Sequence, residues 1–163
     1  MRGSDSMMQY VCDELELLVE IENKAIKQIQ AVFDTSVGIE TGGILIGYYT
    51  VKRDKAVITE LSETPSDSKC GVNWFHRGIE GLKKLLVERW KTRDEYYLGE
   101  WHIHPFSRPM PSGIDRMQMI SISKDKRFNC TEPIMLIIGG GKQFEISRSL
   151  VFRGGIYTLE SCD

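Results

Sequence analysis

The sequence contains no apolar run near the roughly 18 residues that a membrane-spanning helix requires. It also has no large surplus of charge of either sign, because the 21 Lys and Arg residues nearly balance the 23 Asp and Glu residues. A net charge of -2 gives no reason to expect a nucleic acid or a membrane surface as a partner. The polar N-terminus lacks the apolar region of a signal peptide, so we expect a cytoplasmic protein.

A second absence concerns the cysteines, none of which form a C-x-x-C pair. The four residues are scattered along the chain: Cys12, Cys70, Cys130 and Cys162. This distribution favours reduced thiols over a disulfide framework or a structural zinc knuckle. We therefore assign no chemistry to the cysteines.

The length of 163 residues suits one domain with a hydrophobic core and is too short for two domains of ordinary size. The first seven residues, from Met1 to Met7, resemble an expression leader. We expect a disordered leader over residues 1–8 and a single domain over residues 9–163.

The spacing of apolar residues predicts an α+β domain with a mixed, mainly antiparallel sheet flanked by helices. The expected strands cover residues 15–21, 42–49, 56–61, 96–104, 133–139, 143–152 and 156–159. The expected helices cover residues 22–34, 79–90 and 112–123, the second with a solvated face of Lys83, Lys84, Arg89 and Lys91. Residues 64–77 show neither the spacing of apolar residues that is typical of a helix nor that of a strand. We expect them to form the longest irregular loop, and long ordered loops often take part in function.

Two of the three histidines form a His-x-His pair at the end of an expected strand. Because side chains alternate along a strand, His102 and His104 point the same way while Trp101 faces the core. After a proline-rich loop, Ser112 is placed to open a helix that carries Asp115 in its first turn. Catalytic zinc commonly takes three protein ligands of this kind, so we predict a zinc site at the two histidines and the aspartate.

A bound zinc lowers the pKa of water to about 7, but hydrolysis of an amide also needs a group that carries protons. Glu100 shares the strand face of His102, whereas Glu40 precedes the glycines Gly42 and Gly43, whose small size allows close approach. Spacing alone makes the two glutamates nearly equal candidates. A non-haem iron site also uses two histidines and a carboxylate, but it usually reads H-x-D with a distant His.

Ser112 has two interpretations. Its hydroxyl is close enough in sequence to Asp115 to support the oxyanion of a tetrahedral intermediate. Ser112 followed three residues later by Asp115 also fits the capping box of a helix, in which neither side chain does chemistry.

Three segments together resemble the JAMM signature of the JAB/MPN metalloprotease family. They are Glu40-Thr-Gly-Gly-Ile-Leu-Ile-Gly47, Gly99-Glu-Trp-His-Ile-His-Pro105 and Pro111-Ser-Gly-Ile-Asp115. The family pattern is a Glu upstream of H-x-H-x7-S-x2-D, and this chain matches the spacing at every position. Ile103 replaces the Ser or Thr often found between the histidines, but it points away from the metal.

The resemblance implies the MPN/JAMM fold, which is cytidine-deaminase-like, and a zinc metallopeptidase that cleaves after the C-terminus of ubiquitin-like proteins. It further implies that His102, His104 and Asp115 bind Zn2+, that Glu40 is the general acid/base and that Ser112 supports the oxyanion. Glu100 then becomes a neighbour of the site.

The stand-alone form is similar to the JAB-type isopeptidases of CBASS anti-phage operons. This similarity implies E1-like and E2-like proteins and a cGAS-like nucleotidyltransferase as partners, with a conjugated C-terminal tail as the substrate. One alternative is a peptidase that processes a ubiquitin-like sulfur carrier. Another is an inert MPN scaffold, although such scaffolds typically lack part of the ligand set that is complete here.

The remaining candidates lie in the expected loop 64–77. His76 has no partner at metal-ligand spacing and is expected at the surface. Trp74 and Phe75 are expected as packing residues, with contact to a substrate tail as the alternative.

Overall fold

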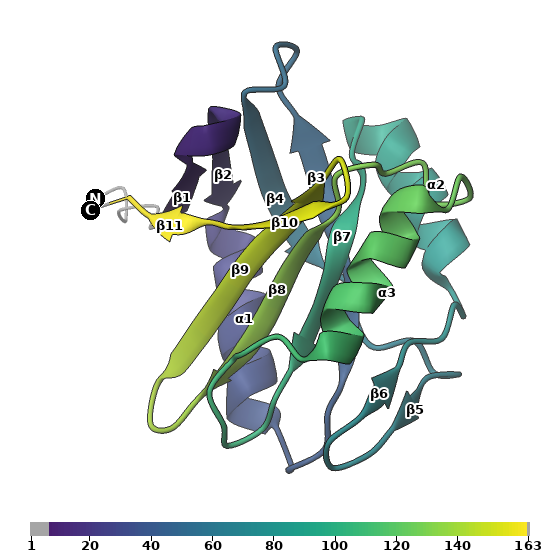
Figure 1. Ribbon diagram of the computed structural model, residues 1–163. Coiled ribbons are helices and arrows are strands. Elements are labelled where there is room, and N and C mark those ends of the chain that lie inside the picture. The colour runs from purple at the N-terminus through teal and green to yellow at the C-terminus, as the bar shows by residue number, and fades with distance from the viewer. Residues whose placement is uncertain (1–6, 163) are drawn as a thin grey trace, which may run out of the picture.

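The computed structural model describes residues 7–162 and forms one large sheet with helices on both faces (Figure 1). The strands of this sheet are β1 (Met8–Cys12), β2 (Leu17–Ile21), β3 (Gly42–Tyr49), β4 (Lys55–Leu61), β7 (Tyr96–Ile103), β8 (Ile134–Gly140), β9 (Phe144–Phe152), β10 (Gly155–Thr158) and β11 (Glu160–Ser161). The helices are α1 (Asn23–Thr35), α2 (Leu82–Arg93) and α3 (Gly113–Lys124), with a short 3-10 turn, η1 (Asp13–Leu15). A separate two-stranded sheet consists of β5 (Lys69–Cys70) and β6 (Phe75–His76).

The large sheet has nine strands in the order β10-β9-β8-β7-β3-β4-β2-β1-β11. Its neighbours are antiparallel except for β2 with β4 and β7 with β8, which run parallel. β7 therefore lies inside the sheet, between β3 and β8, and both of its edges are hydrogen-bonded. The expected α+β class with a mixed, mainly antiparallel sheet is confirmed.

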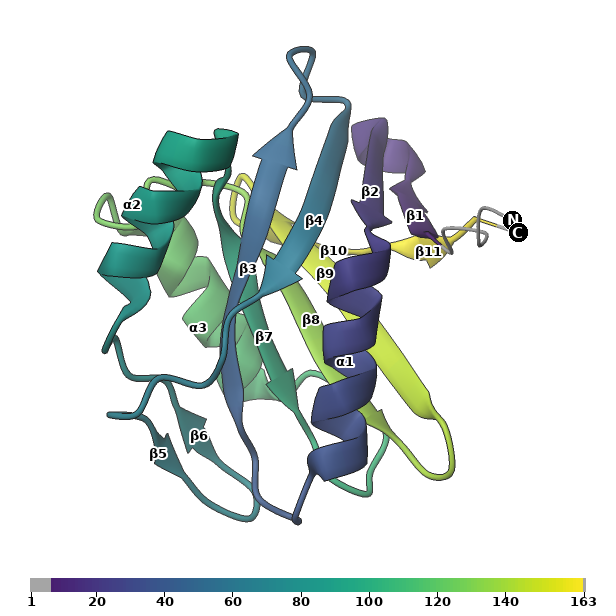
Figure 2. The same ribbon diagram turned by 180° about the vertical axis from the view of Figure 1, so that it is seen from behind.

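The helices divide between the two faces of the sheet (Figure 2). α1 covers one face, where Ala25 and Ile29 join a buried cluster with the sheet residues Trp101 and Ile103. α2 and α3 cover the other face, where a second buried cluster includes Leu82 of α2 and Met119 and Ile122 of α3. Because both faces are covered, the central strands are almost continuously apolar, as β8 shows with every residue buried.

The N-terminal part of the chain departs from the expectation. Of the expected leader, residues 1–6 lie outside the described residues, and Met8 begins β1. The single strand expected over residues 15–21 is instead η1 followed by β2, and β1 pairs antiparallel with β2.

The prediction of an irregular loop over residues 64–77 is wrong in one respect, because this segment contains the paired strands β5 and β6. The second helix begins at Leu82 and not at Ile79, which is exposed. Arg89 was expected on the solvated face of this helix, but it bonds Glu60 of β4 through Nε at 2.6 Å and Nη2 at 2.9 Å. No helix within residues 7–162 combines the length and apolarity that crossing a membrane demands.

Candidate metal centre

The two histidines lie at the end of β7, on the face that α3 covers. His102 pairs with Gly42 of β3 on one side and with Ile137 of β8 on the other. His104 follows the last residue of the strand, and its amide donates a hydrogen bond of 2.8 Å to the carbonyl oxygen of Ile138. The imidazole rings lie with their centroids 5.0 Å apart, so the alternation of the strand brings both rings to one side, as expected.

Asp115 reaches the same place from the first turn of α3. Ser112 is the N-cap of this helix, and its hydroxyl oxygen accepts from the amide of Asp115 at 3.1 Å. In return, Oδ2 of Asp115 accepts from the amide of Ser112 at 2.7 Å. The capping box is therefore present, and it fixes the direction in which the carboxylate of Asp115 points.

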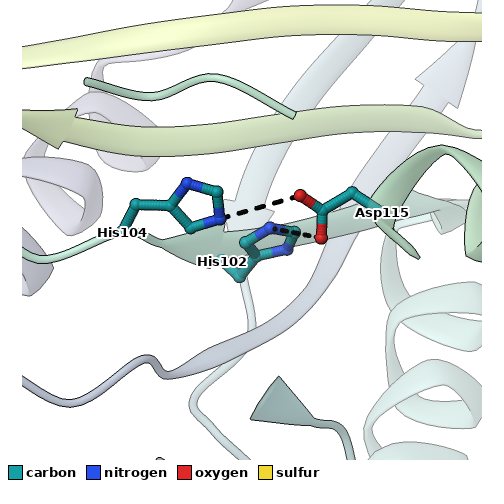
Figure 3. Close-up of side chains that lie close together, drawn as sticks. All are labelled: His102, His104 and Asp115. Atoms are coloured by element: carbon teal, nitrogen blue, oxygen red, sulfur yellow. Dashed lines mark ion pairs between the residues drawn. The ribbon is translucent and has the colours of Figure 1, made fainter. Parts of the chain in front are cut away.

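Figure 3 shows that the three side chains point toward one another. Nε2 of His102 lies 3.2 Å from Oδ1 of Asp115, and Nε2 of His104 lies 3.7 Å from Oδ2. One ligand atom from each of the three residues lies within 4.8 Å of the other two. The sequence-predicted ligands are thus gathered at one point.

This cluster fits a metal ion. Zinc bound at about 2.0–2.2 Å in tetrahedral geometry has ligand atoms about 3.3–3.6 Å apart, close to the spacing of both His–Asp pairs. Nε2 of His102 is buried, and although it lies 3.2 Å from Oδ1 of Asp115, it forms no hydrogen bond of good geometry within the described part of the chain. A buried, unpartnered ring nitrogen is costly, and a metal ion would satisfy it. Two imidazoles and a carboxylate also match the donor set of catalytic zinc.

The ionisation of the ligands suits the same role. Burial raises the pKa of Asp115, but the contacts with His102 and Ser112 outweigh it and lower that pKa to about 2. Burial, and then the neighbouring His102, lower the pKa of His104 below its usual 6.5. Near pH 7 this leaves a carboxylate and a neutral imidazole, which are the forms that bind metals.

Glu40 approaches the cluster from the segment before β3. Its Oε1 lies 4.0 Å from Nε2 of His104, and its side chain is mostly buried. Burial raises the pKa of the Glu40 carboxyl, and Asp115 raises it further while His102 opposes the shift. A carboxyl whose pKa is moved toward neutrality is suited to exchanging protons.

Glu100, the other candidate for the proton carrier, is occupied elsewhere. Its Oε1 accepts a hydrogen bond from Nε of Arg77, and its Oε2 accepts from the hydroxyl of Tyr97 at 3.0 Å. Burial raises the pKa of this carboxyl, whereas Arg77 and Tyr97 lower it. Both oxygens are therefore engaged in an ion pair and a hydrogen bond, which leaves Glu40 as the glutamate that faces the histidines.

Sequence reasoning missed Arg77, the partner of Glu100. The sequence shows only that Arg77 ends the expected loop and that Glu100 lies in an apolar strand just before Trp101. Nothing in the spacing of these two residues indicates that they form an ion pair. Of the aromatic residues in the loop, Phe75 packs against the site and Trp74 is exposed. His76 is exposed, as expected, and lies in β6.

The chain is similar to several proteins of known sequence, among them the following two. A protein from Enterobacter hormaechei subsp. hoffmannii named "CD-NTase/cGAS isopeptidase" is 46% identical over 117 residues, which cover 71% of this chain and 64% of that protein. A protein from Sinorhizobium fredii named "Probable metalloprotease y4qB" is 27% identical, over 64% of this chain and 65% of that protein. The chain thus spans less than two thirds of the length of either relative.

The fold has a counterpart among solved structures. A solution structure of a Desulfitobacterium hafniense protein superposes with a TM-score of 0.59 at 17% identity and covers 88% of each chain. Residues 23–152, which include the three candidate metal ligands and Glu40, match the protein family described as prokaryotic homologs of the JAB domain. The chain therefore belongs to this prokaryotic JAB-domain family.

Proposed function

We propose that this chain is a zinc-dependent peptidase that hydrolyses the amide bond at the C-terminus of a ubiquitin-like modifier or of a conjugated C-terminal tail. The observation that carries the proposal is the convergence of His102, His104 and Asp115, with Glu40 4.0 Å from His104. Membership of the JAB-domain family and the names of the two relatives support it.

His102, His104 and Asp115 would hold the zinc ion. When bound there, zinc would supply a Lewis acid for the scissile carbonyl and would lower the pKa of water from about 15.7 to roughly 7. The capping box and the backbone bond of His104 to β8 support this role, because they hold the ligands in place before the metal arrives.

Glu40 would carry the proton. As a carboxylate it would take a proton from the attacking water, and as a carboxylic acid it would deliver that proton to the leaving amine nitrogen. The raised pKa of Glu40 supports this role, because a carboxyl with a raised pKa holds a proton more readily during the reaction.

Ser112 would support the oxyanion. Its oxygen accepts the hydrogen bond from the amide of Asp115, so its hydroxyl proton is available to a substrate. Ser112 is exposed beside the metal ligands, where such a donor is useful. Capping the helix and donating to the oxyanion use different parts of one hydroxyl, so the two interpretations are compatible.

The substrate would be an extended tail that reaches the metal beside β5 and β6. Exposed strands bind such tails by adding a strand, and the exposed Trp74 offers an apolar contact there. The name of the Enterobacter hormaechei relative supports a conjugated nucleotidyltransferase of the CD-NTase/cGAS class as the target. E1-like and E2-like proteins would form that conjugate in the cytoplasm.

Incubation of the zinc-loaded protein with a set of ubiquitin-like conjugates, read by mass spectrometry, tests the proposal. We expect hydrolysis of one amide bond, which a chelator stops. In a Cys70→Ser variant, alkylation of the exposed Cys162 should leave cleavage intact, because Cys162 belongs neither to the metal cluster nor to β5, beside which the tail is proposed to bind. Inhibition by alkylation and not by the chelator would contradict a metal-dependent mechanism.

A further inference from the structure

Residues 66–81, which we call the hairpin segment, form a unit braced by its own hydrogen bonds. They contain β5, β6 and the turns that flank them. The segment is closed by bonds from Gly71 N to Trp74 O at 2.9 Å, Gly78 N to Ser68 Oγ at 2.9 Å, Ile79 N to Asp67 Oδ2 at 3.0 Å and Glu80 N to Asp67 Oδ1 at 2.9 Å. A segment tied in this way transmits the position of one of its residues to the others.

The hairpin segment contacts the candidate site at two points. The carbonyl oxygen of Gly71 accepts a hydrogen bond of 2.9 Å from the amide of Glu40, so the segment holds the backbone of the proposed proton carrier. The ring of Phe75 lies over Gly42, where an added Cβ would be 2.6 Å from the ring and 2.9 Å from Cβ of His102. The same Cβ would lie only 2.5 Å from the backbone carbonyl oxygen of Trp101 in β7, so glycine is the residue that fits between β7 and the ring.

The segment is anchored to the large sheet by Arg77. Its Nε donates to Glu100 of β7, and its Nη1 donates to the carbonyl oxygen of Gly78 at 2.8 Å. The side chains of Arg77 and Glu100 are only 10% and 7% exposed. The hydroxyl of Tyr97 holds the other oxygen of Glu100, and Glu100 lies two residues before His102 on the same strand. The pair therefore fixes the hairpin segment to the strand that carries the metal ligands.

We propose that Arg77 and Glu100 are positioning residues for the reaction, acting on Glu40 through the hairpin segment. The chain of contacts runs from β7 through Glu100 and Arg77 to the segment, and from Gly71 to the amide of Glu40. This inference rests on the proposed peptidase function and adds to it residues that touch neither metal nor substrate. A displacement of about 1 Å at a reacting group lowers rates by roughly 100-fold, so a loosened segment has a large effect on turnover.

The chain provides a matched control for this pair. Arg89 and Glu60 form an ion pair of similar burial, with side chains 15% and 9% exposed, and join α2 to β4. Neither residue belongs to the hairpin segment or to the metal cluster. We expect loss of either pair to change the stability of the fold, but only loss of the first to free the segment that holds Glu40.

The test compares the double variant Arg77→Met, Glu100→Gln with the double variant Arg89→Met, Glu60→Gln. Zinc content, unfolding by urea, kcat and KM on a tail peptide and hydrogen exchange at the Glu40 amide are measured for both. We expect both to keep zinc and lose stability. We expect only the first to lose kcat, by about tenfold or more, with a smaller change in KM and faster exchange at Glu40.

Wild-type kcat and exchange in the first variant would overturn the inference, and so would an equal loss of kcat in the control. If the first variant fails to fold, Arg77→Lys tests the same contact, because lysine keeps the charge and loses the donors that bridge Glu100 and Gly78. Wild-type kcat and exchange in this variant would also overturn it. Absence of chelator-sensitive cleavage by the zinc-loaded wild-type protein would instead refute the proposed function itself.

Discussion

The amide of Ile103 donates a hydrogen bond of 3.0 Å to the carbonyl oxygen of Thr41. Ile103 lies between the two histidines, and Thr41 follows Glu40. This one bond ties the backbone next to the proposed proton carrier to the backbone between the two candidate metal ligands. The two parts of the candidate site, 62 residues apart in sequence from Glu40 to His102, are therefore held in fixed register by the sheet.

The first prediction concerns the metal. His104→Ala should lower zinc affinity by more than about 100-fold, since it removes one of three ligands and leaves two. Zinc content after dialysis, measured by mass spectrometry, checks this. His76→Ala is the matched control, because His76 is exposed and outside the cluster. Equal zinc content in His104→Ala and wild type would show that the metal is bound elsewhere.

The second prediction separates the two glutamates. Glu40→Gln should keep zinc and lower kcat by about 10²–10⁴-fold, because the amide has nearly the shape of the carboxyl but cannot carry a proton. Steady-state cleavage of a tail peptide, with zinc content measured in parallel, tests it. Near-normal rates in this variant would reassign the proton transfer to Glu100.

The third prediction separates the two functions of Ser112. Ser112→Ala should destabilise the fold by about 1 kcal/mol by removing the helix cap, and Ser112→Gly by only a few tenths, because glycine is tolerated at this position. Both variants should lose about 10²–10³-fold in kcat if the hydroxyl supports the oxyanion.

The two Ser112 variants are compared by urea unfolding and by kcat. Equal losses of kcat with unequal losses of stability are the expected result. If kcat instead follows stability, so that Ser112→Gly turns over like wild type, the hydroxyl serves only as a cap.

The fourth prediction concerns acid stability and the pair between Glu60 and Arg89. The hydrogen bonds from Arg89 hold the pKa of Glu60 below 4.5, although burial opposes the shift. The unfolded chain therefore binds a proton at higher pH than the folded chain. The contribution of Glu60 to stability is present above about pH 4.5 and is lost as the pH falls toward the lower folded-state pKa.

Urea unfolding between pH 7 and pH 3 measures this effect. Glu60→Gln should be less stable than wild type at pH 7, and the difference should shrink as the pH falls. Glu145→Gln is the control, because Glu145 is exposed and forms no ion pair with any residue of the described chain. A constant difference between Glu60→Gln and wild type at all pH values would contradict the prediction.

Much of the fold was predictable because the central strands are long and buried. β3, β7 and β8 are nearly continuous apolar runs, and their apolar character follows from burial on both faces. The two-residue strands β5, β6 and β11 were not predictable, because so short a segment has no period. Their existence depends on partners elsewhere in the chain, such as the pairing of Tyr10 with Ser161.

The clustering of the three candidate metal ligands was predictable for a similar reason. His102 and His104 are two residues apart on one strand, and Asp115 is fixed to Ser112 by a local capping box. The choice between Glu40 and Glu100 was not predictable from spacing, because it depends on where Arg77 lies. The prediction that Arg89 lies on the solvated face of its helix was wrong for a similar reason. Helical periodicity does not reveal that Glu60, an acidic partner, lies opposite on β4.

The interior position of β7 determines how a metal ion would enter and leave. Two of the candidate ligands lie at the end of a strand that is hydrogen-bonded on both edges, and interior strands of this kind open only when much of the protein unfolds. The third ligand, Asp115, lies in the first turn of a helix whose Ser112 is exposed. Fraying of this turn requires far less energy than opening the sheet. If an ion binds at the proposed site, we therefore expect its exchange rate to depend on the N-terminus of α3, while the two histidines keep their positions.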